Sequence, residues 1–298
     1  MKSATSSLHH LLAQHERVYM PDRELHFFCM DDIIQHPDFL FAGQDAHGIP
    51  DYEGDFQRNL DWYQSFFEPA QSNQRIGGYS SLYLAAEDAP ARIKELLPDV
   101  KLIFMLRNPI NRTYSHYWHR VKTGRAVFPF EHELEHGPST LHLRSFYKPQ
   151  LDRYLQRFEK SQIKIVLFER FVDETQTVVD EMCSFLNLPS ALDAEGDGAH
   201  RNRSPVPRLY RLQLLINYFS KGLEKRYEDH LPDAEQHFSN WFFQGVLHRI
   251  RMANLRDGSR PPMDAELRRR LAAVYRRKNR GLNDLLDLDL SDYWPHVG

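Results

Sequence analysis

The sequence VKLIFMLRNP, residues 100–109, is the strongest indication of fold in this chain. Its apolar run is continuous, not alternating, which is typical of a strand buried on both faces of a parallel sheet. Pro109 suits the first turn of the following helix, INRTYSHYWHRVKTG (110–124), and Gly124 is placed to end it. The stretch therefore predicts a buried strand that turns directly into a helix.

The same order of strand and helix recurs further along the chain. QIKIVLFER (162–170) is a second buried apolar run, and VVDEMCSFLNLP (178–189) after it has helical spacing. Strands that alternate with helices predict an α/β fold with a mainly parallel sheet flanked by helices, and we expect one domain over residues 1–298. The other expected elements are helices over 6–18, 55–67, 89–98 and 148–158, strands over 24–28 and near 75–81, a loop over 190–207, and a mostly helical region over 208–286 that ends in a helix over 264–286.

The amino-acid composition argues against several classes of protein. With 41% hydrophobic residues among 298, the chain is globular, and its formal charge of -3 argues against a nucleic-acid partner. No apolar run approaches the roughly 18 residues that span a bilayer, so we expect a cytoplasmic protein without a membrane span. Cys29 and Cys183 are too few for a disulfide framework, and the sixteen histidines lack metal-ligand spacing. We expect no metal.

The segment KSATSSL, residues 2–8, has the residue types of an anion site. Hydroxyl side chains and free backbone N–H groups at a helix start bind phosphate, and Lys2 adds a mobile charge. The segment is not a Walker A loop, in which Lys follows the last Gly, because Lys2 precedes the small residue. The alternative is a Ser/Thr cluster that only caps the helix, with Ser6 or Ser7 at the N-cap.

A second anion site is expected where the central strand ends. Arg107 lies at the carboxyl end of the run, which is where open α/β sheets bind their ligands. Ser115 follows about two turns into the next helix, and Arg offers a bidentate fork to a phosphate. The alternative is an Arg107 that pairs with a surface carboxylate.

Taken together, four ordered segments resemble the sulfotransferases that use 3′-phosphoadenosine-5′-phosphosulfate (PAPS). The likeness is to the heparan-sulfate-type and bacterial branch, and it implies a P-loop-like three-layer fold with a helical C-terminal region and PAPS as co-substrate without a metal. The segments are KSATSSL (2–8), RELHFF (23–28), LRNPINRTYSHY (106–117) and AVYRRKNRGLNDLLDLDLSDYW (273–294).

The resemblance also implies roles for single residues. Glu24 would be the general base that takes the proton of an acceptor hydroxyl, with His26 beside the acceptor. Alternation along 24–28 would turn Glu24, His26 and Phe28 to one face. For the donor, Lys2 would contact the transferred group, the loop Ser3, Ala4, Thr5, Ser6 and Ser7 would hold the 5′-phosphate, Arg107 and Ser115 would hold the 3′-phosphate, and Arg201, Arg203 or Arg208 would reach the 3′-phosphate or an anionic acceptor.

The chain departs from the family pattern at three places. Ala4 stands where the family has Gly, which costs roughly 1 kcal/mol if the position requires positive φ. Gly78 and Tyr79 stand where relatives carry Glu and, in some, Lys, although Ser80 and Tyr83 match. The phosphate loop of this fold follows a central strand, whereas this sequence begins inside the loop, so we expect an apolar β segment upstream of Met1.

These features bear on three candidate functions. The first is sulfuryl transfer from PAPS to a hydroxyl acceptor, with a glycan or a small metabolite among the acceptor classes. The second is a P-loop nucleotide kinase or NTPase, which requires a Gly-Lys-Ser/Thr order that the chain lacks. The third is a non-catalytic or truncated nucleotide-binding relative. Stabilisation by 3′,5′-ADP but not by ATP separates the first from the second. The sequence does not predict the oligomeric state.

Overall fold

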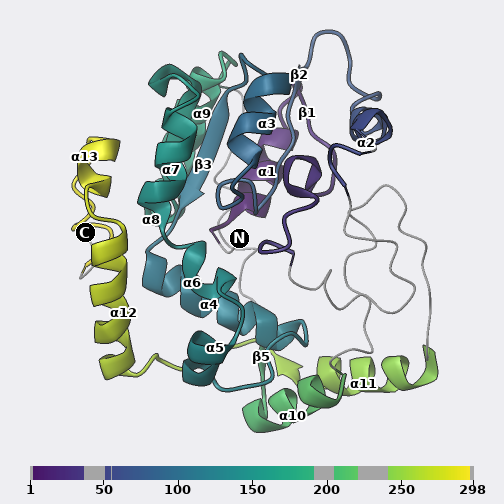
Figure 1. Ribbon diagram of the computed structural model, residues 1–298, viewed down its shortest axis with the longest axis vertical. Coiled ribbons are helices and arrows are strands. Elements are labelled where there is room, and N and C mark those ends of the chain that lie inside the picture. The colour runs from purple at the N-terminus through teal and green to yellow at the C-terminus, as the bar shows by residue number, and fades with distance from the viewer. Residues whose placement is uncertain (1–2, 37–50, 55, 191–204, 221–240, 296–298) are drawn as a thin grey trace.

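The computed structural model of the protein describes residues 3–36, 51–54, 56–190, 205–220 and 241–295 (Figure 1). The first half contains α1 (Thr5–Ala13), β1 (Val18–Tyr19), the 3-10 turn η1 (Phe27–Cys29), α2 (Phe56–Ser65), β2 (Arg75–Ile76), α3 (Ala89–Leu96), β3 (Leu102–Leu106), α4 (Pro109–Lys122), α5 (Phe130–His136), α6 (Thr140–Leu143) and α7 (Tyr147–Leu155). The second half contains η3 (Lys160–Gln162), β4 (Ile163–Leu167), α8 (Phe168–Asp173), α9 (Thr175–Phe185), β5 (Val206–Pro207), α10 (Tyr210–Ser220), α11 (Trp241–Ala253), β6 (Leu255–Arg256), α12 (Ala265–Lys278) and α13 (Leu282–Leu286).

Strands β3 and β4 form the centre of the fold. They pair in parallel over five residues, from Leu102 opposite Ile163 to Leu106 opposite Leu167. Because side chains alternate along a strand, Phe104 and Leu106 enter one hydrophobic cluster and Met105 enters the other. Both faces of the pair are therefore covered, which accounts for the uninterrupted apolar sequence.

Helix α1 packs on one face of this pair. Leu8, Leu11 and Leu12 are buried in the same cluster as Met105 and Val166. After α1 the chain enters β1, which pairs in parallel with β2 and not with β3. The described strands thus form two parallel pairs, β1–β2 and β3–β4, and a short antiparallel pair, β5–β6.

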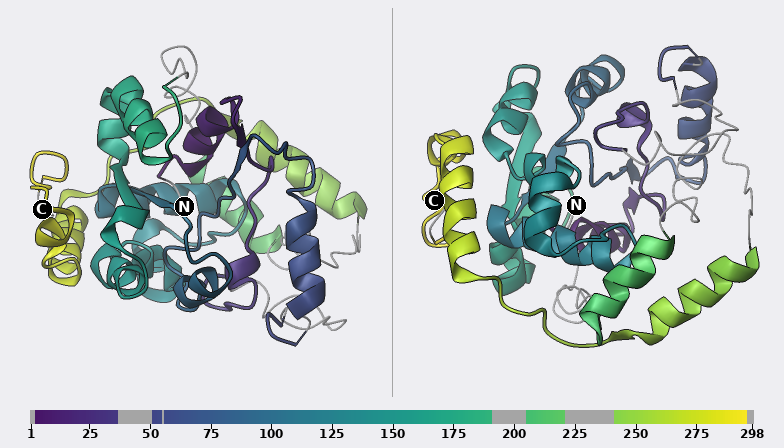
Figure 2. Two further views of the ribbon diagram at one scale, coloured as in Figure 1. Left: turned by 90° about the horizontal axis from the view of Figure 1, so that it is seen from above. Right: turned by 60° about the horizontal axis from the view of Figure 1, so that its bottom comes forward.

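The C-terminal helices lie at the periphery. Both views of Figure 2 show the yellow helices α12 and α13 at one edge of the molecule, apart from the green helices α10 and α11. The hydroxyl groups of Tyr275, in α12, and Thr113, in α4, lie 2.6 Å apart. Trp294 is 1% exposed, and its Nε1–H donates to Glu169 at 2.9 Å. These contacts join the C-terminal part of the chain to α4 and α8, the helices that follow β3 and β4.

Most of the expected elements are present, and the α/β class is confirmed. The expected strand over 24–28 is wrong, because Phe27 and Phe28 are both buried and the backbone turns into η1. Phe27 and Phe28 enter the same hydrophobic cluster, whereas successive side chains of a strand point to opposite faces. The expected helix over 264–286 is divided at Gly281, whose φ of 81° is left-handed. In the part of the chain described here, no helix is both long and apolar enough to cross a membrane.

An ion-pair cluster joins β4 to helices α8 and α9. Glu181 accepts hydrogen bonds from Lys164 Nζ at 2.8 Å and from Arg170 Nη2 at 2.6 Å. The Arg170 hydrogen bond, followed by the Lys164 hydrogen bond, lowers the pKa of Glu181 below its ordinary value of 4.5. A lowered carboxyl pKa stabilises the folded state above the ordinary pKa, and this stabilisation is lost as the pH falls through the folded-state value.

We expect Glu181→Gln to lower the free energy of unfolding at pH 7 by about 1 kcal/mol or less, because the pair is partly exposed. The difference from the parent chain should shrink as the pH falls below about 4.5. Urea unfolding at several pH values measures it. Glu87→Gln, on an exposed carboxylate, is the control and should change little. A Glu181→Gln deficit that persists undiminished at low pH would contradict this account.

Candidate active site

The turn before α1 places its backbone as an anion site requires. Ala4 is left-handed, with φ 59° and ψ 27°, and its carbonyl accepts the N–H groups of Ser7 and Leu8 at 3.0 Å. The N–H groups of Thr5 and Ser6 precede the first intrahelical hydrogen bond, so the helix leaves them for a ligand or water. Ser3 is 3% exposed and lines a cavity together with Thr5. The N-cap is Ala4, so the expectation of Ser6 or Ser7 at that position is wrong.

Glu24 is held by the turn that follows β2. Its Oε2 accepts hydrogen bonds from the Ser81 backbone N–H at 3.1 Å and from Ser81 Oγ–H at 2.7 Å. The Glu24 side chain is 24% exposed. Both donors act on the same oxygen, so the carboxylate is fixed while part of it remains open to solvent.

His26 adjoins this carboxylate. Its Nε2 lies 3.6 Å from Glu24 Oε2, and its Nδ1 lies 2.8 Å from Ser80 Oγ. Ser80 Oγ also accepts the Leu82 N–H at 3.1 Å, which fixes the hydroxyl in the turn. The structure thus brings Glu24 and His26 together, as the sequence predicted, although a turn and not strand alternation does so.

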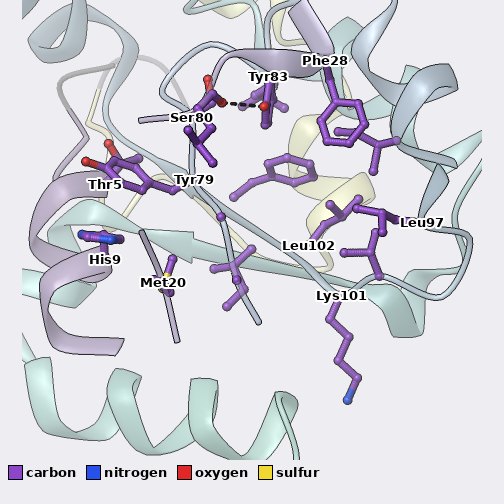
Figure 3. Close-up of a pocket in the computed structure, with 18 of the residues that line it drawn as sticks. Thr5, His9, Met20, Phe28, Tyr79, Ser80, Tyr83, Leu97, Lys101 and Leu102 are labelled. Atoms are coloured by element: carbon purple, nitrogen blue, oxygen red, sulfur yellow. Dashed lines mark hydrogen bonds between the residues drawn. The ribbon is translucent and has the colours of Figure 1, made fainter. Parts of the chain in front are cut away.

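His9 and Tyr79 lie on the same side of the cavity as Ser80 (Figure 3). Their rings stack at a centroid distance of 4.2 Å, and His9 Nε2–H donates to the Pro21 carbonyl at 2.9 Å. Burial lowers the pKa of His9, so the ring is held neutral. Burial, followed by the Glu24 charge, raises the pKa of Tyr79 to about 12. Figure 3 shows Thr5, His9, Tyr79 and Ser80 at the same side of the cavity.

Hydrogen bonds of Asn108 hold the turn between β3 and α4. Asn108 Oδ1 caps α4 by accepting the N–H groups of Ile110 at 3.1 Å and Asn111 at 3.2 Å. The Asn108 N–H donates to Glu169 Oε1 at 3.0 Å. Since Glu169 also accepts from Trp294, one carboxylate links the turn to the end of the chain.

Arg107 lies directly after β3, as expected from the sequence. Its guanidinium carbon is 4.2 Å from the centroid of the Phe168 ring, and its carbonyl accepts the Tyr147 hydroxyl at 2.7 Å. Burial lowers the pKa of Arg107, and the charge of Glu169 opposes this shift. Ser115 is 1% exposed within α4, so a phosphate can reach its hydroxyl only if covering segments move. Joint binding of the 3′-phosphate by these two residues stays a prediction.

Several residues of the expected site are not part of this geometry. Lys2, Arg201 and Arg203 lie outside the described residues. Among the described residues, no group of three or more His, Cys, Asp or Glu side chains could hold a metal ion. Ser81 was not singled out from the sequence, because a serine in a turn carries no signal that its N–H and hydroxyl meet a carboxylate 57 residues away.

Comparison with known proteins defines the class of this chain. The sequence model of the Sulfotransferase family matches residues 1–193. The match includes the α1 turn, Glu24, His26 and the β3–α4 turn. The chain belongs to the sulfotransferase family.

Individual relatives agree with this assignment. A bifunctional heparan sulfate N-deacetylase/N-sulfotransferase 1 from Xenopus laevis is 30% identical over 202 residues, which is 62% of this chain and 22% of that protein. The human heparan sulfate glucosamine 3-O-sulfotransferase 6 is 29% identical over 163 residues, 51% of this chain and 46% of that protein. The chain thus spans less than half the length of either relative.

One solved structure supports the fold. The crystal structure of a sulfotransferase from Alicyclobacillus acidocaldarius is similar with a TM-score of 0.62 over 98% of this chain and 94% of that one. At 23% sequence identity, this likeness concerns the fold alone.

We expect Ala4→Gly to raise the free energy of unfolding by about 1 kcal/mol, because the left-handed backbone strains an L side chain but not glycine. Ala13→Gly, at the last residue of the same helix, is the matched control and should lower stability by about 0.5–1 kcal/mol. Chemical unfolding of both variants measures the difference. A loss of stability in both would show that Ala4 is not strained in solution.

Proposed function

We propose that this protein transfers a sulfuryl group from PAPS to a hydroxyl group of an acceptor, with Glu24 as the general base. The observation that carries the proposal is the Glu24 carboxylate, which Ser81 fixes and His26 adjoins. A positioned base must be both oriented and accessible, and Glu24 meets both conditions.

The α1 turn supports the donor side of the proposal. Free N–H groups and hydroxyls at Thr5 and Ser6 suit the 5′-phosphate, and the positive end of the helix dipole favours its charge. Lys2 precedes this turn in sequence and would neutralise charge on the phosphate oxygen that leaves. Arg107 would bind the 3′-phosphate.

The chemistry requires little beyond positioning and charge neutralisation. PAPS supplies the sulfuryl group and a phosphate leaving group. As the acceptor oxygen bonds to sulfur and the bond from sulfur to the phosphate oxygen breaks, Glu24 would take the acceptor proton. His26, 3.6 Å from Glu24 and anchored by Ser80, would orient the acceptor hydroxyl.

A carbohydrate is the acceptor class that we propose. The support is the similarity of the chain to heparan sulfate sulfotransferases. The acceptor itself would be identified by screening glycan and small-metabolite hydroxyls with labelled donor.

We expect Glu24→Gln to reduce sulfuryl transfer from ³⁵S-labelled PAPS by about 10²–10⁴-fold, because the amide cannot accept the proton. Product counts over a panel of glycan acceptors measure the rate. As a control for folding, the Glu24→Gln variant should still bind 3′,5′-ADP, and a thermal-shift assay measures this binding. Equal rates for both proteins would exclude Glu24 as the base, and no transfer by the parent chain to any acceptor would overturn the proposed activity.

We expect Ser81→Ala to lower kcat about tenfold with an unchanged KM for PAPS, because one of the two donors that orient Glu24 is lost. Ser81→Thr keeps the hydroxyl and is the matched control, which should restore most of the rate. A rise in KM for PAPS with unchanged kcat would instead show that Ser81 contributes to the binding of PAPS.

A further inference from the structure

Helices α10 and α11 lie at one edge of the molecule (Figure 1). The side chain of Asn254, directly after α11, joins them: its Nδ2–H donates to Gln213 Oε1 in α10 at 3.1 Å, and its Oδ1 accepts the Leu209 N–H at 3.0 Å. The short pair β5–β6 also connects the residues before α10 to those after α11. The two helices are therefore fixed to each other.

The side of α10 that faces the protein is partly polar. Gln213 and Asn217 are both fully buried. Asn217 Nδ2–H donates to the carbonyl groups of Val121 at 2.9 Å and Ala126 at 2.8 Å, and its Oδ1 accepts from Gln213 Nε2–H at 3.0 Å. Because a buried amide that loses its partners is unfavourable, these hydrogen bonds fix the rotation of the helix about its axis.

The opposite side of α10 is apolar and exposed. Leu214 and Ile216 are buried, but five other large side chains in and beside this helix are 40–65% exposed: Leu209, Leu212, Leu215, Tyr218 and Phe219. Among them, Leu212, Leu215 and Phe219 have the i, i+3, i+7 spacing of one helix face. A surface helix of a globular protein normally turns its polar face outward, so this arrangement is the reverse of the ordinary one.

Helix α11 also exposes apolar side chains, namely Val246, Ile250 and Met252. Eight of the fifteen exposed large hydrophobic side chains among the described residues therefore lie in 209–219 and 246–252. Exposed hydrophobic residues are normally scattered singly, and a concentration of them marks an interaction surface.

The charged groups of these two helices have one sign. Residues 209–220 and 241–256 include four arginines and no Asp or Glu, although the whole chain has a formal charge of -3. Arg211, Arg249 and Arg256 are exposed, whereas Arg251 is buried. We use the term α10–α11 face for the exposed side chains of 209–219 and 246–256. Where the structure describes them, they are all apolar, aromatic or arginine.

The charge distinguishes between the possible occupants of this face. In a symmetric contact between two copies the same face meets itself, so the arginines of both copies would approach each other without a carboxylate between them. An anionic lipid surface offers the opposite charge at its headgroups and an acyl layer below them for the apolar side chains. Tyr218 and Phe219 belong to the residue types that lie at the boundary between these layers.

We propose that the α10–α11 face binds the surface of an anionic phospholipid membrane. Both helices lie in the plane of the interface, where their apolar side chains enter the boundary between headgroups and acyl chains and their arginines contact the headgroups. Neither helix crosses the bilayer in this arrangement, because 11 and 13 residues are too few to do so. The inference does not rest on the proposed sulfuryl transfer.

Vesicle flotation tests the proposal. The full chain is mixed with vesicles of phosphatidylcholine and phosphatidylserine in equal parts, and separately with vesicles of phosphatidylcholine alone. We expect binding to the mixed vesicles to be about tenfold stronger or more, because each exposed arginine is attracted to the anionic surface. This difference should decrease as salt is added.

Two double variants separate the apolar contribution from the charged one. Leu215→Ser combined with Phe219→Ser should weaken binding to the mixed vesicles about tenfold or more, because two side chains that enter the acyl boundary are lost. Arg211→Gln combined with Arg249→Gln should also weaken it about tenfold or more, while binding to phosphatidylcholine alone should change little.

The matched controls lie at another edge of the molecule, where Figure 2 shows α12 and α13. Leu288→Ser and Arg280→Gln replace exposed side chains there and should bind vesicles as the parent chain does. The Tm of the variant with Leu215→Ser and Phe219→Ser should equal that of the parent chain without vesicles, because both side chains are already exposed.

Four other outcomes overturn the proposal. The first is equal binding to both kinds of vesicle, no binding, or full binding by the variant with Leu215→Ser and Phe219→Ser. The second is a dimer of the parent chain in analytical ultracentrifugation that this variant does not form, which assigns the face to a second copy. The third is a lower Tm of this variant without vesicles, which shows that another segment of the chain covers the face. The fourth is stabilisation by poly-L-glutamate without vesicle binding, which assigns the face to an acidic protein.

Discussion

The parallel pairing of β3 with β4 is the constraint on which the rest of the structure depends. Since alternate side chains of β3 enter two different hydrophobic clusters, the pair must be covered on both faces. Helix α1 covers one face through its leucines, and that contact fixes the turn at Ala4. At the carboxyl end of β3, the Asn108 cap and Glu169 fix the start of α4. Both expected anion sites are thus positioned by the same two strands.

The region around Glu24 and His26 depends on a different kind of constraint. It is built from two turns, 23–29 and 77–83, that meet through hydrogen bonds and not through a continuous strand. Leu25 N–H donates to the Tyr79 carbonyl, Ser81 fixes Glu24, and Ser80 fixes His26. The aromatic rings of Phe27 and Tyr63 stack beneath these turns at 4.6 Å. The polar groups of the site therefore lie next to a packed aromatic layer.

Much of the fold could be predicted because its elements have clear local patterns. The buried run of β3, Pro109 at the first turn of α4 and Gly124 after it follow rules that act within a few residues. The strand predicted over 24–28 is wrong because its alternation is too short to decide the local structure: packing against Tyr63 and Tyr83 turns both Phe27 and Phe28 inward. Long-range contacts decided a segment whose local preference was weak.

The sequence by itself determined the strand-turn-helix order and the family motifs, and it singled out Glu24, His26 and Arg107 as candidate site residues, since these are written in residue type and spacing. The tertiary structure alone decided that Ser81 holds Glu24, that Ala4 is left-handed and that Ser115 is buried. The physical reason is that hydrogen bonds between distant turns, backbone strain and burial depend on the relative placement of segments, which no local pattern encodes.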